Sequence, residues 1–224
     1  MARREHVMHG MTTPVSSQSS AGRAPMYVRV IPPEEAEGDV RRIYDFDLEH
    51  DGYISNTTLL YSLNPSAYTA MDPLFDAITA QLTPRRFELA TITAARALRC
   101  RFCVSAHADE LLKSKIFDRA QLEAIVRDYR TAGLDAVEVA NMALAEKVAL
   151  DAWRVTQEEV DALRGHGLSD VEIFNVVLAA AARAMYSKSL DAMGAATDDA
   201  LSSTSDLFDM VDLSTLPGHK ASLS

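Results

Sequence analysis

Two cysteines stand three positions apart, at Cys100 and Cys103, and His107 follows four positions after the second. On a helix, residues three and four apart share a face, so the sulfurs would lie within disulfide range and the imidazole beside the second thiol. A thiol in the first turn of a helix also meets unpaired backbone N–H groups and the positive end of the helix dipole, which stabilise a thiolate. The spacing predicts a redox-active dithiol with His107 as its proton partner.

Glu88 is the second candidate for proton transfer, because it interrupts the apolar run FELATITAARAL. Burial of a carboxylate is costly unless it is paired, and it raises the pKa toward the range of a general base or proton shuttle. One straight helix would hold Glu88 roughly 30 Å from His107, at about 1.5 Å per residue. We therefore expect the chain to bend around residues 99–102, so that the acid and the imidazole can cooperate.

The same residues have plainer interpretations. The two thiols could pack as small apolar groups, or they could join Glu88 and His107 in a zinc site. Taken alone, Glu88 suits a surface ion pair with Arg85. No second Cys-x-x-Cys or His-x-x-x-His completes a typical structural zinc site, and the joint occurrence of four reactive residues favours redox chemistry. Residues assigned to turns or packing are His166, Trp153, Tyr44, Tyr61 and Tyr68.

Helix starts are marked by proline in the first turn. We expect starts at Pro33, which precedes two glutamates, and at Pro65, Pro73 and Pro84, which follow Asn, Asp and Thr. With few alternating β-branched runs to compete, these signals predict an all-α bundle.

Two later helices carry capping boxes, in which a hydroxyl and a glutamate satisfy each other's backbone donors. These boxes begin at Thr156 and Ser169. Apolar residues then recur at helical spacing, which predicts one face turned to a core. The stripes are Val171, Phe174, Leu178, Ala181 and Met185, and, earlier in the chain, Leu134, Val137, Leu144 and Val148.

The chain divides by composition into three parts. Residues 1–25, rich in Ser, Thr, Gly and Pro, predict a disordered leader, and 26–194 predict the helical domain. Residues 195–224 predict a tail that either stays mobile or docks as a short helix. Within the domain, residues 27–31 favour an extended strand or coil.

The overall charge limits the partners. The 224 residues carry a net charge of -10, with 48% hydrophobic residues, so the chain would repel a phosphate backbone and nucleic acid is excluded as a partner. No apolar stretch is long enough to span a membrane, and no secretory signal is present. We expect a cytoplasmic protein, and a reducing environment disfavours a structural disulfide as the reason for the two cysteines.

The order Glu, eleven residues, Cys-x-x-Cys, three residues, His, realised as Glu88, Cys100, Cys103 and His107, resembles the AhpD-like alkylhydroperoxidase branch of the carboxymuconolactone decarboxylase superfamily. The segment RGHGLSDVEIFNVVLAAAARAMYSKSLDAMG is similar to later helices of peroxidase-related members. The resemblance implies an AhpD-like helical bundle, a homo-oligomer (trimer or hexamer), and reduction of small hydroperoxides without a cofactor or metal. By the same resemblance Cys103 is the peroxidatic thiolate, Cys100 the resolving thiol, and Glu88 and His107 the proton relay, with an external dithiol as reductant.

Two departures from the family pattern stand out. Phe102 occupies the position where the best-studied members carry a histidine immediately before the second cysteine, and Ser187 stands where related chains often have asparagine. The missing histidine predicts slow peroxidase turnover or a different substrate. Two other functions stay open: a lactone decarboxylase or isomerase, which would not need the cysteines, and a non-enzymatic redox-sensing helical oligomer.

Overall fold

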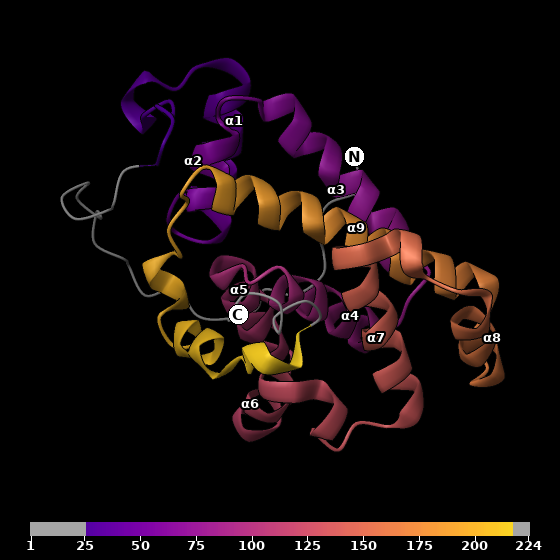
Figure 1. Ribbon diagram of the computed structural model, residues 1–224. Coiled ribbons are helices and arrows are strands. Elements are labelled where there is room, and N and C mark those ends of the chain that lie inside the picture. Colours follow the sequence, from indigo (N-terminus) through magenta and orange to yellow (C-terminus); the bar gives the residue numbers. More distant parts are fainter. Residues whose placement is uncertain (1–25, 217–224) are drawn as a thin grey trace, which may run out of the picture.

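The computed structural model describes residues 26–216, and every regular element in that range is a helix, as the sequence predicts (Figure 1). The predicted leader, residues 1–25, and the last residues of the tail, 217–224, lie outside the described range. The α-helices are α1 (Gly38–His50), α2 (Asn56–Tyr61), α3 (Pro65–Thr79), α4 (Pro84–Ala97), α5 (Arg101–Lys113), α6 (Arg119–Asp128), α7 (Ala136–Asp151), α8 (Gln157–Gly165) and α9 (Asp170–Ala192). Short 3-10 turns are η1 (Pro33–Glu35), η2 (Tyr129–Thr131), η3 (Ala152–Arg154), η4 (Asp199–Leu201), η5 (Ser205–Met210) and η6 (Leu213–Thr215).

The capping signals begin helices where they were expected. The side chains of Asn64 and Thr83 accept backbone hydrogen bonds at the starts of α3 and α4. The capping boxes at Thr156 and Ser169 are both formed, at the starts of α8 and α9. These caps satisfy N–H groups that have no partner inside the helix, so a few local residues fix each boundary.

Two of the four proline signals were wrong as starts of α-helices. Pro73 lies inside α3, at an exposed position where water can reach the carbonyl that loses its helical donor. Pro33 begins only the single 3-10 turn η1, and α1 starts later, at Gly38. Residues 27–31, expected to be extended or coil, form no strand.

The centre of the bundle is formed by α4, α7 and α9, which pack against one another. Helix α5 folds back beside α4, and α3 crosses α9 on the side that also carries α1 and α2 (Figure 1). The core has one large cluster around α4, α7 and α9 and another that contains both cysteines. In the described part of the chain, no helix is long and apolar enough to cross a bilayer.

The expected core stripe of α9 was assigned to the wrong face. Val171, Phe174 and Met185 are 54%, 59% and 44% exposed. The buried face of α9 is the neighbouring one, which carries small and branched side chains such as Ile173, Val176, Ala179, Ala180 and Leu190. Because α9 is apolar on more than one side, periodicity could not decide which side meets α4 and α7.

The aromatic assignments were partly right. Tyr44 is fully buried, and Tyr61 and Tyr68 pack against the cysteine-containing cluster. Trp153, expected to pack, is 84% exposed. The earlier stripe does face inward, since Leu144 is buried and its other members are partly buried.

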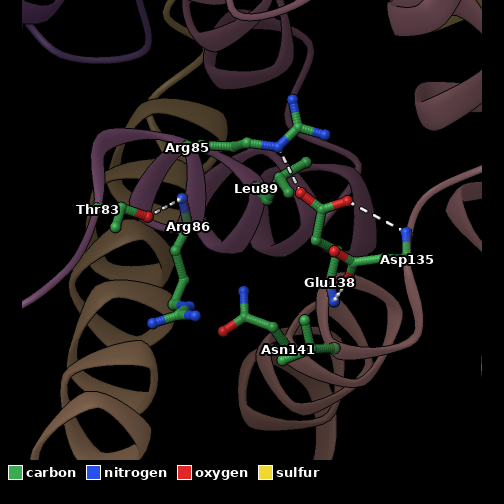
Figure 2. A pocket seen from close by; sticks show the side chains of 8 residues that line it. Thr83, Arg85, Arg86, Leu89, Asp135, Glu138 and Asn141 are labelled. Atoms are coloured by element: carbon green, nitrogen blue, oxygen red, sulfur yellow. Dashed lines mark hydrogen bonds and ion pairs between the residues drawn. The ribbon is translucent and has the colours of Figure 1, made fainter. Parts of the chain in front are cut away.

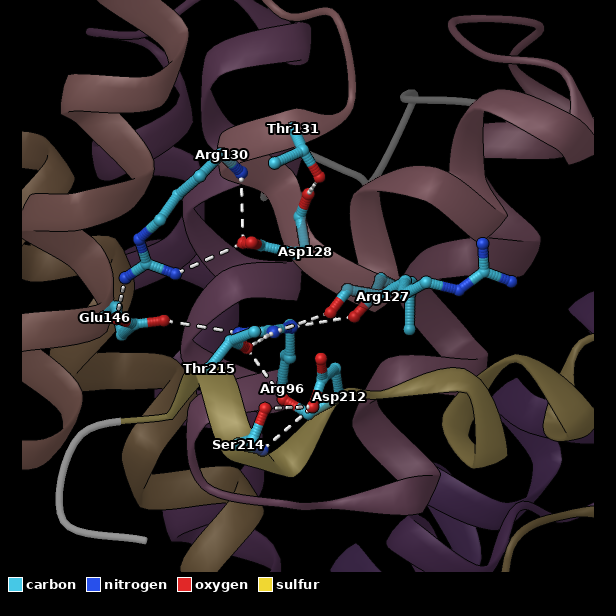
Figure 3. A network of polar contacts seen from close by, with 10 residues as sticks. Arg96, Arg127, Asp128, Arg130, Thr131, Glu146, Asp212, Ser214 and Thr215 are labelled. Atoms are coloured by element: carbon cyan, nitrogen blue, oxygen red, sulfur yellow. Dashed lines mark hydrogen bonds and ion pairs between the residues drawn. The ribbon is translucent and has the colours of Figure 1, made fainter. Parts of the chain in front are cut away.

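Residues 195–216 dock on the domain as the turns η4, η5 and η6, which run along α5 and α6 (Figure 1). The buried side chain of Arg96 binds the end of this segment through Thr215 (Figure 3). Arg96 donates to the backbone carbonyls of residues 126 and 127, to the Thr215 hydroxyl at 2.5 Å, and to Glu146 at 3.3 Å. Arg130 bonds the second oxygen of Glu146 at 2.5 Å. The charge of Arg96 is therefore paired and hydrogen-bonded, as burial requires.

Candidate active site

The chain reverses direction between α4 and α5, in the expected segment. Arg99 adopts a left-handed backbone with φ of 61°, a conformation that usually favours glycine. The N–H groups of Arg99 and Cys100 donate to the carbonyls of Arg96 and Ala95, which is the Schellman arrangement that ends a helix. Because α5 starts again at once, at Arg101, it folds back along α4.

This reversal brings Glu88 of α4 to His107 of α5. The Nδ1 atom of His107 lies 2.7 Å from Oε2 of Glu88, and the Thr91 hydroxyl is 3.3 Å from the same nitrogen. The side chains of Glu88 and His107 are only 12% and 10% exposed. A carboxylate on Nδ1 holds the proton there, which leaves Nε2 as the basic nitrogen. The Arg85 alternative was wrong, since Arg85 pairs with Glu138.

The two thiols occupy the first turn of α5. Cys100 is the residue that caps the helix and Cys103 is the third residue within it, and both are free thiols with 0% and 1% exposure. The backbone N–H groups of this turn supply the partial positive charge expected to favour a thiolate.

The two sulfurs have opposite electrostatic environments. The pKa of Cys103 is well below the ordinary thiol value, chiefly because the Cys100 thiol donates to it, with further help from Arg183, Ser187 and His107 and against the effect of burial. The pKa of Cys100 is raised by that same hydrogen bond and by burial. The negative charge is therefore favoured on the Cys103 sulfur and the proton on the Cys100 sulfur.

Helix α9 supplies groups that the sequence reasoning missed or left without a role. The Nη1 atom of Arg183 lies 3.8 Å from the Cys103 sulfur. Ser187, noted earlier only as a departure from the family, is fully buried and helps to lower the pKa of the same sulfur. The pKa of Asp191 is raised by burial, against a hydrogen bond with Cys100. The one available signal was a lone arginine inside the run LAAAARAMY, which has no fixed spacing from the cysteines.

Phe102 takes no part in proton transfer. It is 9% exposed and belongs to the apolar cluster that also contains both cysteines. The position before Cys103 therefore contributes packing, and the polar groups around the sulfur come from α9 and from His107.

A separate cavity of about 110 Å³ lies between the beginnings of α4 and α7 (Figure 2). None of the four predicted site residues lines it. Asn141 projects into it from α7, buried and with no hydrogen-bond partner for either amide atom among the described residues. Ordered water could satisfy such an amide. The lining residues are Thr83, Arg85, Arg86, Leu89, Asp135, Val137, Glu138 and Asn141.

The acidic, histidine and cysteine side chains of residues 26–216 include no group of three or more placed to hold a metal ion. The candidate site therefore consists of the two buried sulfurs of Cys100 and Cys103, an imidazole bonded to a carboxylate, and an arginine. This set can carry out nucleophilic attack by sulfur, transfer of protons, and reversible disulfide formation.

Comparisons with known proteins give one family match and several solved structures of similar fold. The model of the carboxymuconolactone decarboxylase family matches residues 65–158, a range that contains Glu88, both cysteines and His107. No curated protein sequence matches this chain.

Solved structures similar to this chain cover most of its length. An AhpD-core, peroxidase-related protein from Ralstonia eutropha JMP134 is 20% identical with a TM-score of 0.72, over 82% of this chain and 98% of its own. A peroxidase-related protein from Silicibacter sp. TM1040 is 20% identical with a TM-score of 0.70, over 88% of this chain and 100% of its own. A variant of the debrominase Bmp8 in complex with 2,3,4-tribromopyrrole is 18% identical with a TM-score of 0.63, over 85% and 100%.

Proposed function

We propose that this chain is a thiol-dependent reductase of small organic hydroperoxides, since the carboxymuconolactone decarboxylase family model matches residues 65–158 and the fold is AhpD-like. The observation that carries the proposal is the difference between the electrostatic environments of the two sulfurs. In the first turn of α5 the pKa of the Cys103 thiol is lowered and the Arg183 guanidinium lies 3.8 Å from its sulfur, whereas the pKa of the Cys100 thiol, three residues away, is raised. A nucleophile and its resolving partner need this difference in protonation.

In the proposed reaction, the Cys103 thiolate donates an electron pair to one peroxide oxygen, so that an S–O bond forms while the O–O bond breaks. The departing alkoxide takes a proton and leaves as an alcohol, and Cys103 becomes a sulfenic acid. The Cys100 thiol then loses its proton and attacks the Cys103 sulfur, which forms the disulfide and releases water. An external dithiol in a reducing, cytoplasmic setting returns both thiols.

His107 and Glu88 have the proton-transfer roles in this scheme. The Glu88 carboxylate fixes the imidazole through Nδ1, and Nε2 can accept the proton of the resolving thiol and return it to a leaving oxygen. Their position is supported by the helical spacing of four residues between Cys103 and His107, which puts both on one face of α5.

The test is stopped-flow oxidation by cumene hydroperoxide, followed by turnover with dithiothreitol as the reductant. We expect Cys103→Ser to abolish peroxide consumption and Cys100→Ser to limit it to about one equivalent. Equal rates in wild type and Cys103→Ser would remove the peroxidatic assignment. Lactone decarboxylase activity that persists after replacement of both cysteines would contradict the proposal and favour that enzyme class. A Cys100–Cys103 disulfide that forms without catalytic turnover would indicate a redox sensor.

The likeness to a debrominase favours a second candidate, thiol-dependent reduction of a halogenated aromatic compound. One feature of this chain supports it: the rings of Phe75 and Tyr186 flank Arg183, next to the reactive sulfur. Release of bromide from tribromopyrrole, in the absence of any peroxide reaction, would select this candidate.

Assembly into a homo-oligomer, trimer or hexamer, is part of the proposal. Its support is the exposed apolar stripe on α9, formed by Val171, Phe174 and Met185 at the surface of the chain. Three large apolar side chains on one helix face are unfavourable in water and typical of a surface that a second copy covers.

A further inference from the structure

Arg183 is a partly buried cation that makes no ion pair with any carboxylate among residues 26–216. Its only polar contact in that range is the one between Nη1 and the Cys103 sulfur, at 3.8 Å. The Nε atom is buried and has no hydrogen-bond partner there. A guanidinium has five N–H donors, so most of its donor capacity beside the sulfur is unused.

Two rings fix where this guanidinium lies. The Arg183 guanidinium carbon is 5.6 Å from the centre of the Phe75 ring and 5.3 Å from that of Tyr186. Both contacts are within the range of cation–π attraction, which holds the cation without using its N–H groups. Cys103 and Tyr186 are only 1% and 7% exposed, so the charge acts on the sulfur with less screening than at a surface.

We infer that Arg183 is a catalytic residue of the thiol site, which holds Cys103 as a thiolate and binds the oxygen that departs when the sulfur attacks a peroxide. The second role rests on the proposed function, whereas the first does not. In this chain an arginine from α9 provides the positive charge, while the residue before Cys103, Phe102, is apolar and cannot provide it.

The inference can be written as a balanced step. As the S–O bond forms and the O–O bond breaks, negative charge moves from the Cys103 sulfur to the leaving oxygen. A donor on Arg183 that pairs with the sulfur at the start can therefore pair with that oxygen in the transition state, before a proton converts the alkoxide to an alcohol. Charge stabilisation at a developing oxyanion is the type of interaction that accelerates such a step most.

Other groups also act on the Cys103 sulfur, and the experiment has to separate them from Arg183. On α5 these are the Cys100 thiol, which donates to the sulfur, and His107, which favours the thiolate and is itself bonded to Glu88 of α4. On α9, Ser187 favours the thiolate and Asp191 opposes the negative charge. All of them stay in place when only Arg183 is changed.

The first measurement is the pH dependence of Cys103 alkylation by iodoacetamide, with the modified cysteine identified by mass spectrometry. We expect Arg183→Met to move the midpoint about one pH unit higher and to lower the rate about tenfold at pH values below the wild-type midpoint, the factor that corresponds to one pKa unit. The matched control is Lys188→Met, which removes an exposed cation from the same helix and should leave the profile unchanged. An unchanged midpoint in Arg183→Met would overturn the thiolate-holding role.

The second measurement is the ratio of the cumene hydroperoxide rate to the iodoacetamide rate. Both reactions need the thiolate, so the ratio cancels the thiolate fraction and reports on the leaving oxygen. We expect this ratio to fall about tenfold in Arg183→Met and to stay constant in Lys188→Met. A constant ratio in Arg183→Met would overturn the role at the leaving oxygen.

Two further results keep the inference testable. If Arg183→Met does not fold, Arg183→Lys takes its place. Because lysine keeps the charge but lacks the planar fork of donors, the pH midpoint of alkylation should stay close to that of the wild type, whereas the ratio of the cumene hydroperoxide rate to the iodoacetamide rate should fall. A wild-type protein that shows the Arg183-dependent alkylation profile but never reacts with peroxide would contradict the proposed function and leave the thiolate-holding role intact.

Discussion

His107 and Glu88 are joined by a contact of 2.7 Å between Nδ1 and Oε2, although one residue is in α4 and the other in α5. The contact is nearly closed to solvent, so it orients the ring in a setting of low dielectric. It also commits one imidazole nitrogen to the carboxylate and leaves the other for chemistry at the sulfurs.

Replacing Glu88 should slow peroxide reduction without destroying the thiolate. In Glu88→Gln the amide can still accept a hydrogen bond, but it lacks the charge that fixes the tautomer of His107. We expect the turnover number to fall by about ten- to a hundredfold, at the lower end of general acid–base effects. The measurement is steady-state consumption of cumene hydroperoxide with dithiothreitol.

The matched control for this change is Glu110→Gln. Glu110 is a partly buried carboxyl near Glu88, with a pKa raised by burial first and by the Glu88 charge second, and it makes no hydrogen bond to His107. Its replacement should change turnover less than about threefold. If both variants lost activity equally, local charge and not the His107 contact would explain the loss.

Removing the resolving thiol should trap the oxidised sulfur. In Cys100→Ser, Cys103 can still react with one equivalent of peroxide, but no thiol remains three residues away to form the disulfide. We expect a sulfenic acid on Cys103, detected as a dimedone adduct by mass spectrometry. An adduct on Cys100 in the reciprocal Cys103→Ser variant would reverse the assignment of the two sulfurs.

The stability of the reduced protein should depend on pH through Cys103. Its pKa is lowered on folding, so the folded chain holds the thiolate where the unfolded chain, with a thiol pKa of roughly 8.5, still holds the proton. The stabilisation is therefore complete above about pH 8.5 and is lost as the pH falls through the folded pKa.

Urea unfolding under reducing conditions checks this dependence. Between pH 7 and 8.5 we expect the free energy of unfolding to rise by up to about 1.4 kcal/mol per pH unit relative to Cys103→Ser. Above that range the raised pKa of Cys100 acts in the opposite direction, because only the unfolded chain loses that proton. Parallel pH profiles for the two proteins would contradict the thiolate assignment.

The buried pair of Arg96 and Glu146 should be important for stability. Both side chains are nearly inaccessible, at 2% and 4% exposure. Glu146→Gln leaves the Arg96 charge buried without its carboxylate, and we expect a loss of roughly 3–5 kcal/mol in the free energy of unfolding. Glu159→Gln is the control, since its pair with Lys147 lies at the surface, with the two side chains 45% and 27% exposed, and contributes at most about 1 kcal/mol.

A charge on the outer stripe of α9 should reduce self-association. Phe174 is 59% exposed in the single chain, so Phe174→Glu costs little within the chain and places a charge where a second copy would pack. We expect sedimentation equilibrium to show a smaller species for this variant and an oligomer for the wild type. If Phe174→Glu and the wild type had the same oligomer mass, this face would be excluded as the interface.

Several features could be predicted from local sequence because they depend on residues only a few positions apart. Asn64, Thr83, Thr156 and Ser169 begin helices where their capping chemistry indicates. The Cys100 and Cys103 spacing and the need for a bend after α4 are equally local. Each follows from hydrogen bonds and side-chain neighbours within one or two helical turns.

Only the tertiary structure determined which side chains from distant helices contact one another. Arg183, Ser187 and Asp191 reach the sulfurs from α9, 80 or more positions along the chain, and no fixed sequence spacing predicts these contacts. The outward turn of Phe174 was decided in the same way, because α9 is apolar on two sides and packing against α4 and α7 chose between them. Local patterns set where a helix begins and what it carries, whereas the competition of its faces for the core sets which side chains reach the site.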